Sequence, residues 1–234
     1  MLFRSPLHLE AAVAAGKHVY CEKPVAIDAA GVVRAAAAAA RSRSAGLALV
    51  SGLCFRRDER MLELVARIHD GAIGRPLAVQ AHAAIGLPWR KPVASGPDQG
   101  EWPVRNWISF TRFSGGHFVE RHVEAVDRAV WILGDMPPLL AEPLGRLAGL
   151  AAAERASAGP LDSIGDCPAT TAVRYRFADG RTIEASIDRR EQLRDRHVEA
   201  AFGSNGRCDI VRGTISGRRR SEEHTSELQS RQYL

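Results

Sequence analysis

The sequence predicts an α/β fold in two parts: a partial layer of parallel strands, followed by an α+β domain with a mainly antiparallel, open sheet. Up to residue 50, helical and strand-like segments alternate, which is typical of a parallel layer. Beyond residue 53, four strand-like segments form two pairs around short turns, which indicates antiparallel hairpins. The composition, with 45% hydrophobic and 25% charged residues, is that of an ordinary globular protein.

The first part contains two helices and two short strands. An Ala/Leu-rich helix is expected over residues 7–15, with Gly16 at its C-cap. A strand follows at residues 17–21, and Asp28 is a suitable N-cap for a second helix through an alanine run. Residues 47–50 are the second strand. Strands that alternate with helices in this way pair in parallel.

The second part opens with a helix over residues 57–69 and a strand over residues 77–85. Apolar residues recur at helical spacing in the first of these: Met61, Leu62, Leu64, Val65 and Ile68. A Pro/Gly-rich connection over residues 86–104 precedes another helix, which we expect to begin near Glu120 and to end at Gly134.

Two hairpins complete the predicted sheet. The first joins residues 172–177 to residues 182–188 around an Asp-Gly pair. The second joins residues 197–202 to residues 207–211 around a Ser-Asn-Gly turn. Asp-Gly and Asn-Gly between strand-like segments are strong hairpin signals.

Composition and spacing exclude several classes of protein. No apolar run approaches the ~20 residues needed to cross a bilayer, so we expect no membrane span. The net charge of +5 is spread among acidic residues, so nucleic acid is not a predicted partner. Cys21, Cys54, Cys167 and Cys208 are far apart and form no CxxC pair, which argues against a zinc knuckle or a disulfide framework. This cysteine usage favours a reducing, cytoplasmic compartment.

The stretch from residue 14 to residue 26 is the most informative for chemistry. Glu22, Lys23 and Pro24 lie at the carboxyl end of the first strand, where open α/β sheets bind their ligands. The Lys23 ammonium can pair with Glu22, hold a substrate hydroxyl and favour the alkoxide that develops when a hydride leaves. Pro24 fixes the direction of the backbone. The competing interpretation is an ordinary surface lysine.

Residues 15–26, AGKHVYCEKPVA, resemble the most characteristic motif of the glucose-fructose oxidoreductase, inositol dehydrogenase and rhizopine-catabolism (Gfo/Idh/MocA) family. Further segments that resemble this family follow in the same order: residues 51–57, 70–74, 105–107 and 114–122. The last two look like a branch often described as exported oxidoreductases, so export stays open beside the cytoplasm. The resemblance implies an N-terminal Rossmann domain, a C-terminal domain with an open antiparallel sheet, and NAD(P)-dependent oxidation of sugars or cyclitols.

The resemblance also implies roles for individual residues. Lys23 would contact the substrate near the nicotinamide, with Glu22, Pro24 and Arg56 on the cofactor side. Residues expected on the substrate side are Arg105, Trp107 and Asp127. The opening strand, the glycine-rich phosphate loop and the ribose-binding acid of the family have no counterpart, and no GxGxxG occurs. We therefore expect the 234-residue chain to bind NAD or NADP poorly or not at all.

A second constellation spans residues 115–127, where the family pattern is G-G-x-x-x-D-x-x-x-H-x-x-D. This sequence has Glu120 in place of the Asp and Glu124 in place of the usually catalytic His, whereas Asp127 matches. Glu120 and Glu124 share one helical face. Repulsion between two such carboxylates raises the proton affinity of at least one of them, so Glu124 could replace the missing imidazole as general base, with Glu120 beside it in the catalytic group.

Three other interpretations of this helix stay open. His122 is an alternative base, although it points roughly the opposite way from Glu124. The activity could instead be weakened or altered, or the two glutamates could be a solvated helix face. A metal site is not predicted, because the i,i+5 gap between His117 and His122 fits poorly.

Three tryptophans suggest a wall on which a sugar ring stacks: Trp89, Trp102 and Trp107. The equal alternative is that these rings pack beneath the sheet.

Both ends of the chain look foreign to the protein. Residues 220–230 read as the translation of a common sequencing-adapter oligonucleotide, and residues 2–5 as that of its complementary end. We therefore expect residues 1–5 to be an adapter-like scar and residues 220–234 an adapter-like tail. Residues 6–52 would then be the C-terminal part of a Rossmann domain, and residues 53–219 most of a substrate and oligomerisation domain.

The predicted function is that of a fragment, itself inactive, of an NAD(P)-dependent oxidoreductase acting on a sugar, cyclitol or polyol hydroxyl. The parent is expected to form a homo-oligomer through its open sheet. One alternative is an NAD-dependent glycoside hydrolase or lyase that uses transient oxidation. The other is a non-catalytic sugar-binding or scaffold relative, suggested by the loss of the family His at Glu124.

Overall fold

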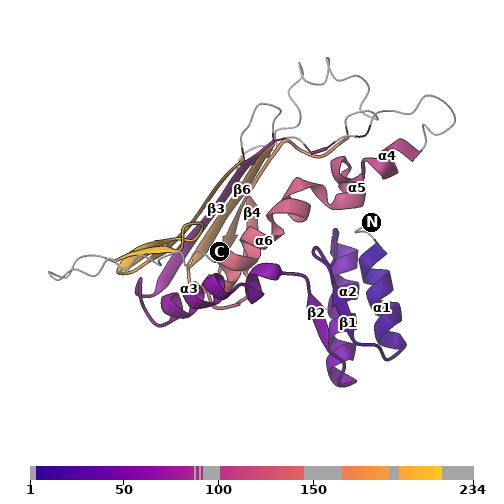
Figure 1. Ribbon diagram of the computed structural model, residues 1–234, viewed down its shortest axis with the longest axis horizontal. Helices are drawn as coiled ribbons and strands as arrows, with labels where there is room; N and C mark the ends of the chain where they lie inside the picture. Colours follow the sequence, from indigo (N-terminus) through magenta and orange to yellow (C-terminus); the bar gives the residue numbers. More distant parts are fainter. Residues whose placement is uncertain are drawn as a thin grey trace, which may run out of the picture.

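The computed structural model describes residues 4–86, 88–89, 91, 101–144, 165–189 and 195–217. A small α/β layer at the N-terminal end is joined by a short linker to a large sheet that carries helices on one face (Figure 1). In the described part of the chain, no helix is both long and apolar enough to cross a membrane.

The N-terminal layer consists of α1 (Ser5–Ala14), β1 (Val19–Cys21), α2 (Ala29–Ser44) and β2 (Leu49–Ser51). The two strands pair in parallel, so the predicted helix–strand rhythm is confirmed. The predicted N-cap is also confirmed, because the Asp28 carboxylate accepts a hydrogen bond from the Gly31 amide at 2.6 Å.

The large sheet has seven strands in the order β4-β5-β6-β3-β7-β8-β9. Their bounds are β3 Pro76–Ile85, β4 Leu140–Pro143, β5 Thr170–Arg176, β6 Thr182–Arg189, β7 Arg196–Gly203, β8 Gly206–Asp209 and β9 Thr214–Gly217. Neighbouring strands are antiparallel except β3 and β6, which pair in parallel at the centre. Both predicted hairpins are present, as β5–β6 and β7–β8.

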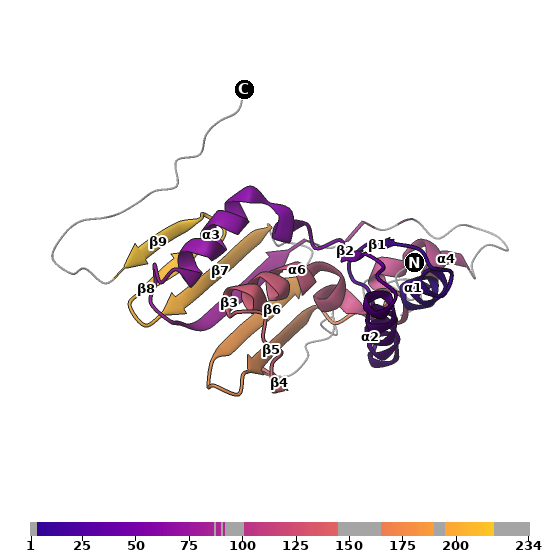
Figure 2. The same ribbon diagram turned by 90° about the horizontal axis from the view of Figure 1, so that it is seen from below.

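Two long helices, α3 (Glu59–His69) and α6 (Gly116–Ile132), cover one face of this sheet (Figure 2). Shorter helical turns complete the domain: η2 (Cys54–Arg57), α4 (Trp102–Arg105), η4 (Trp107–Ser109) and α5 (Thr111–Ser114). Alternate residues of β3 and β6 point under the helices, so that Val79 and Ile183 are buried with Leu64 and Ile132 in one core.

The structure corrects two expectations about these helices. The second helix begins at Gly116, four residues before the expected start near Glu120, because Gly115 adopts a left-handed backbone (φ 77°) that separates it from α5. Leu62 is 44% exposed, because the buried stripe of α3 is Met61, Leu64, Val65 and Ile68 at helical spacing.

Candidate functional site

The turn that follows β1 meets α6, and Lys23 and Glu124 come together there. The Lys23 ammonium donates a hydrogen bond to the main-chain oxygen of Glu120 at 2.9 Å. The same nitrogen lies 3.4 Å from Oε2 of Glu124, and the two side chains are 21% and 22% exposed. The N-terminal layer and α6 thus meet through Lys23 and Glu124, two residues that the sequence indicated as candidates from separate motifs.

The side chain of Glu120 points to a different cation. Its Oε2 lies 3.2 Å from Nε of Arg121, and this buried oxygen has no partner in hydrogen-bonding geometry. Glu120 and Glu124 therefore each face a positive charge of their own, which offsets the repulsion expected between them. Of the two, Glu124 is the carboxylate that contacts Lys23.

Glu22 lies where the carboxyl ends of β1 and β2 meet. A Cβ atom added to Gly52 would come within 2.4 Å of the Glu22 carboxylate, so a larger residue there would displace this carboxylate from its present position. The charge of Glu22 is also the main reason why the pKa of Tyr20 is raised. Pro24, after Lys23, is buried. This strand edge is where an open α/β sheet binds its ligand.

Arg56 and Asp127, which were assigned to the cofactor and the substrate sides, contact each other. Arg56 donates two hydrogen bonds from Nε and one from Nη2 to the carboxylate of Asp127, at 2.9–3.0 Å. It also binds Asp135 through both terminal nitrogens. These carboxylates raise the pKa of Arg56. The roles of Arg56 toward the cofactor and of Asp127 toward the substrate stay predictions.

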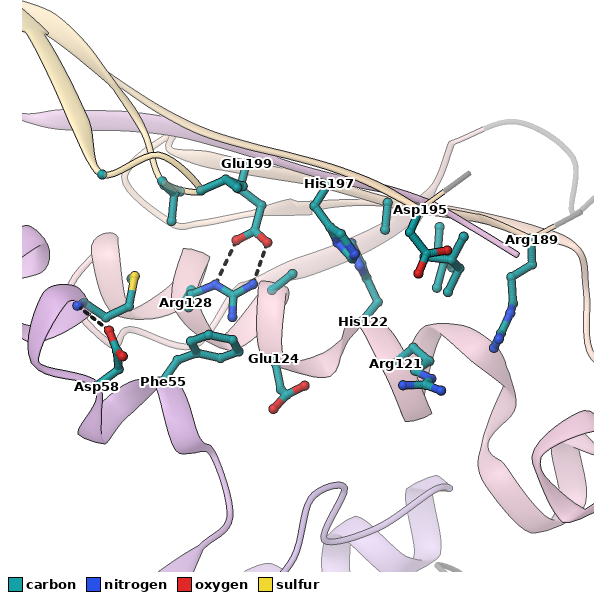
Figure 3. Close-up of a pocket in the computed structure, with 18 of the residues that line it drawn as sticks. Phe55, Asp58, Arg121, His122, Glu124, Arg128, Arg189, Asp195, His197 and Glu199 are labelled. Carbon is teal, nitrogen blue, oxygen red and sulfur yellow. Dashed lines mark hydrogen bonds and ion pairs between the residues drawn. The ribbon is translucent and has the colours of Figure 1, made fainter. Parts of the chain in front are cut away.

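His122 lies on the opposite side of α6, against the sheet (Figure 3). Its Nε2 donates a hydrogen bond to the main-chain oxygen of Ala81 at 2.8 Å. Burial lowers the pKa of His122, despite the opposing effect of that carbonyl. The direction of the side chain agrees with the expectation from helical geometry, and it places Glu124 rather than His122 beside Lys23.

A cavity of about 610 Å³ lies between α3, α6 and the sheet, and Glu124 lines it. Polar lining residues come from several elements (Figure 3), among them Asp58, Arg121, His122, Glu124, Arg128, Arg189, Asp195, His197 and Glu199. Apolar side chains from α3 and the central strands line the rest, among them Met61 and Ile187. The volume is that of a site for a small molecule.

Sequence reasoning missed most of these polar residues. Arg128 binds Glu199 through two nitrogens, at 2.8 Å from Nε, and its guanidinium carbon lies 3.9 Å above the centre of the Phe55 ring. Glu199 occupies an inward-facing position of β7. A charged residue at an apolar position of a strand pattern is the one signal that could have identified it.

Arg189 is a second buried arginine at this cavity. It donates hydrogen bonds to the main-chain oxygen of Gly86 at 2.9 Å and to Nδ1 of His117 at 3.1 Å. Burial, with the nearby charges of Arg189 and Arg121, lowers the pKa of His117 to about 3. His117 is therefore a neutral acceptor within the fold.

The remaining predicted substrate residues lie elsewhere. Arg105 is exposed and pairs with Glu101 at 3.5 Å, and Trp107 is half-buried in η4. The three tryptophans do not form one wall, because Trp102 is buried edge-on against Phe110 whereas Trp89 lines the cavity. Within the described ranges, no group of three His, Cys, Asp or Glu residues could hold a metal ion.

The relatives found among known proteins are named as a dehydrogenase and a reductase. No protein-family model matches the chain. The myo-inositol 2-dehydrogenase of Thermotoga maritima is 28% identical over 203 residues, which cover 86% of this chain and 52% of that protein. The 1,5-anhydro-D-fructose reductase of Ensifer adhaerens is 39% identical over 103 residues, which cover 38% of this chain and 29% of that protein. The chain thus spans about half the length, or less, of these relatives.

Solved structures share the fold over most of this chain. Myo-inositol 2-dehydrogenase from Lactobacillus plantarum superposes with a TM-score of 0.64 at 22% identity, covering 88% of this chain and 54% of that one. GenD2 from gentamicin A biosynthesis, in complex with NAD, gives 0.64 at 20% identity, with 90% and 52% covered. Levoglucosan dehydrogenase, in complex with NADH and levoglucosan, gives 0.67 at 16% identity, with 94% and 56% covered.

The described architecture is a parallel layer with a lysine at its strand ends, joined to an open sheet whose covering helix meets that lysine. The same architecture is found in the solved dehydrogenase structures that superpose on this chain. These relatives and the shared fold support the resemblance to the Gfo/Idh/MocA family.

Proposed function

We propose that this chain is part of an NAD(P)-dependent oxidoreductase that acts on a hydroxyl group of a sugar, cyclitol or polyol. The proposal rests on the contact between Lys23, at the carboxyl end of β1, and Glu124, which lines the cavity beside α6. The names of the relatives support the substrate class, since they refer to a cyclitol and an anhydro sugar.

The residues present fit the nicotinamide end of the cofactor. Glu22 and Lys23 lie at the carboxyl ends of two parallel strands, and Gly52 allows close approach of the backbone there. The sequence has no GxGxxG, so the residues that would hold the phosphates are not in this chain. We propose that a longer product supplies them. The choice between NAD and NADP depends on those residues.

The chain's own residues would orient the substrate and move one proton. When bound, the nicotinamide supplies the hydride chemistry. The Lys23 ammonium holds the reacting hydroxyl and favours its alkoxide, since positive charge near a developing anion stabilises it. Glu124, as a carboxylate 3.4 Å from that ammonium, accepts the proton from the hydroxyl during oxidation and returns it during reduction.

The assay for this function is the reduction of NAD and NADP, followed by absorbance at 340 nm, with a panel of cyclitols, polyols and aldoses. The gene product that contains this chain is compared with the 234-residue chain alone, for which we expect no turnover. Accumulation of NADH or NADPH with a cyclitol or sugar supports the proposal. Turnover without accumulation would indicate the elimination route, and binding without turnover would indicate a non-catalytic relative.

Lys23→Met is the decisive variant for this assay. We expect it to lower kcat/KM by about a hundredfold or more, because it removes the cation that stabilises the alkoxide. Lys17→Met is the matched control, since Lys17 is exposed in the same layer, and its rate should stay unchanged. Equal rates for the unmodified protein and Lys23→Met would contradict the assigned role of Lys23.

A further inference from the structure

We infer that the linker turn η2 is a positioning device that holds Glu124 against Lys23, and that Arg56 is its principal positioning residue. The inference rests on the proposed function, since it concerns the same residue pair. Arg56 binds Asp127 and Asp135, so it acts on the pair through another group, by fixing the linker to α6.

Three consecutive residues of the turn bind one stripe of α6. The Cys54 thiol donates a hydrogen bond to Oε1 of Glu124 at 3.5 Å. Phe55 stacks against Arg128, and Arg56 binds Asp127. The helix residues 124, 127 and 128 follow i, i+3, i+4 spacing, so they lie on one face. The linker is therefore attached to the same face of α6 that carries Glu124.

Arg56 makes the strongest of these attachments. Its planar guanidinium spans two carboxylates, a geometry that lysine cannot reproduce. Asp127 is only 14% exposed in this pair, whereas Asp135 is 50% exposed, so Asp127 contributes the better-shielded contact. The guanidinium also lies 5.3 Å from the centre of the Trp131 ring, one turn further along α6.

The attachment of the linker to α6 helps to orient the Glu124 carboxylate. Oε1 faces Cys54 on the linker, and Oε2 faces Lys23 on the N-terminal layer. Because the linker connects that layer to the sheet domain, holding the linker on α6 also limits how far Lys23 can move from Glu124. If Arg56 is lost, the layer should move as a whole and the contact should open.

Zero-length cross-linking measures this contact in the 234-residue chain. A carbodiimide activates a carboxylate, and an amide forms only where a lysine amine already touches it. The chain contains three lysines, Lys17, Lys23 and Lys91, so the product is readily assigned. Trypsin cuts after Arg121 and thus separates Glu120 from Glu124. Lys23→Arg and Glu124→Gln provide blanks, and circular dichroism verifies folding.

Arg56→Gln should lower the yield of the Lys23–Glu124 amide by about fivefold, because charge-assisted contacts to two carboxylates are lost. Arg57→Gln is the matched control, since Arg57 is the next residue of the same turn and is exposed, and its yield should not change. An unchanged yield in folded Arg56→Gln would overturn the inference, as would an equal fall in Arg57→Gln.

Asp135→Asn keeps the inference falsifiable if Arg56→Gln does not fold. It removes only the more exposed partner of Arg56, so the yield should fall by about twofold. An unchanged yield in this variant would overturn the inference in that case. The two experiments distinguish failure of this inference from failure of the proposed function. If only the proposed function is wrong, the gene product is inactive in the reduction assay, whereas the yield of the cross-link still depends on Arg56.

Discussion

Two ion pairs of α6, one helical turn apart, differ in nearly every physical respect. Arg128 and Glu199 are almost fully buried beneath the sheet and joined through two nitrogens. Lys23 and Glu124 face the N-terminal layer, are about a fifth exposed and are separated by 3.4 Å. The first pair is shielded from solvent and stabilises the fold. In the second pair, the ammonium and the carboxylate can exchange each other for a ligand.

The comparison shows that one helix carries both a buried ion pair that stabilises the fold and a partly exposed ion pair that is available to a ligand. A buried charge must keep its partner, because an uncompensated ion in a low-dielectric interior is costly. A partly exposed pair is weakly coupled and can open at little cost. Glu124 and Arg128 are four residues apart and share one face of α6. Their side chains nevertheless turn in different directions, Arg128 toward the sheet and Glu124 away from it (Figure 3), so they meet different partners.

Removing Glu199 is the change with the largest expected effect. Glu199→Ala leaves the Arg128 guanidinium buried without its counter-charge, so the free energy of unfolding should fall by about 3–5 kcal/mol. Urea denaturation followed by circular dichroism measures it. Glu184→Ala is the control, because Glu184 pairs with Arg174 at a partly exposed site, and it should cost less than about 1 kcal/mol. Similar losses in the two variants would remove the distinction between buried and exposed pairs.

Acidification tests the buried imidazole of His117, in the first turn of α6. The pKa of His117 is lowered from 6.5 to about 3, so below pH 6.5 the unfolded chain binds a proton that the folded chain does not. The free energy of unfolding should therefore fall as the pH is lowered from 6.5 toward 3. One such proton contributes a slope of about 1.4 kcal/mol per pH unit.

His117→Gln should remove that part of the slope in denaturation series at pH 7, 6 and 5. His8→Gln, at an exposed position of α1, is the matched control and should leave the slope as it is. A slope unchanged by the replacement of His117 would show that its imidazole is protonated in the fold, contrary to its burial beside Arg189.

The smallest expected effect on stability is that of Glu124→Gln. Because its pair with Lys23 is long and partly exposed, the free energy of unfolding should change by less than about 1 kcal/mol. The same variant should lower the proposed oxidoreductase activity of the gene product, since an amide cannot accept the substrate proton. A loss of stability near that of Glu199→Ala would mean that the two pairs are alike.

Much of the fold could be predicted from the sequence because the relevant signals are local. Asp28 before an alanine run indicates a helix start, and an Asp-Gly or Asn-Gly pair between strands indicates a hairpin, whatever lies elsewhere in the chain. The start of α6 was placed too late, because Gly115 and Gly116 resemble a loop until the left-handed turn between α5 and α6 is known.

The candidate site was only partly predictable. Lys23 could be identified from its motif at the end of a strand, and Glu124 from its position in the family pattern and its helical spacing from Glu120. Arg128, Arg189 and Glu199 belong to no recognisable local pattern of chemistry, and they meet at the cavity only because β6 and β7 pass on either side of β3.

The sequence by itself determined most of the elements, the family resemblance and the lysine at the strand edge, because each depends on neighbours within a few turns of the chain. The tertiary structure alone decided which face of α6 meets Lys23, which partners Arg56 takes, and which charges are buried. Those contacts join residues 70 or more positions apart, such as Arg56 and Asp127, so no local pattern encodes them. They follow from the packing of the sheet, the helix and the linker together.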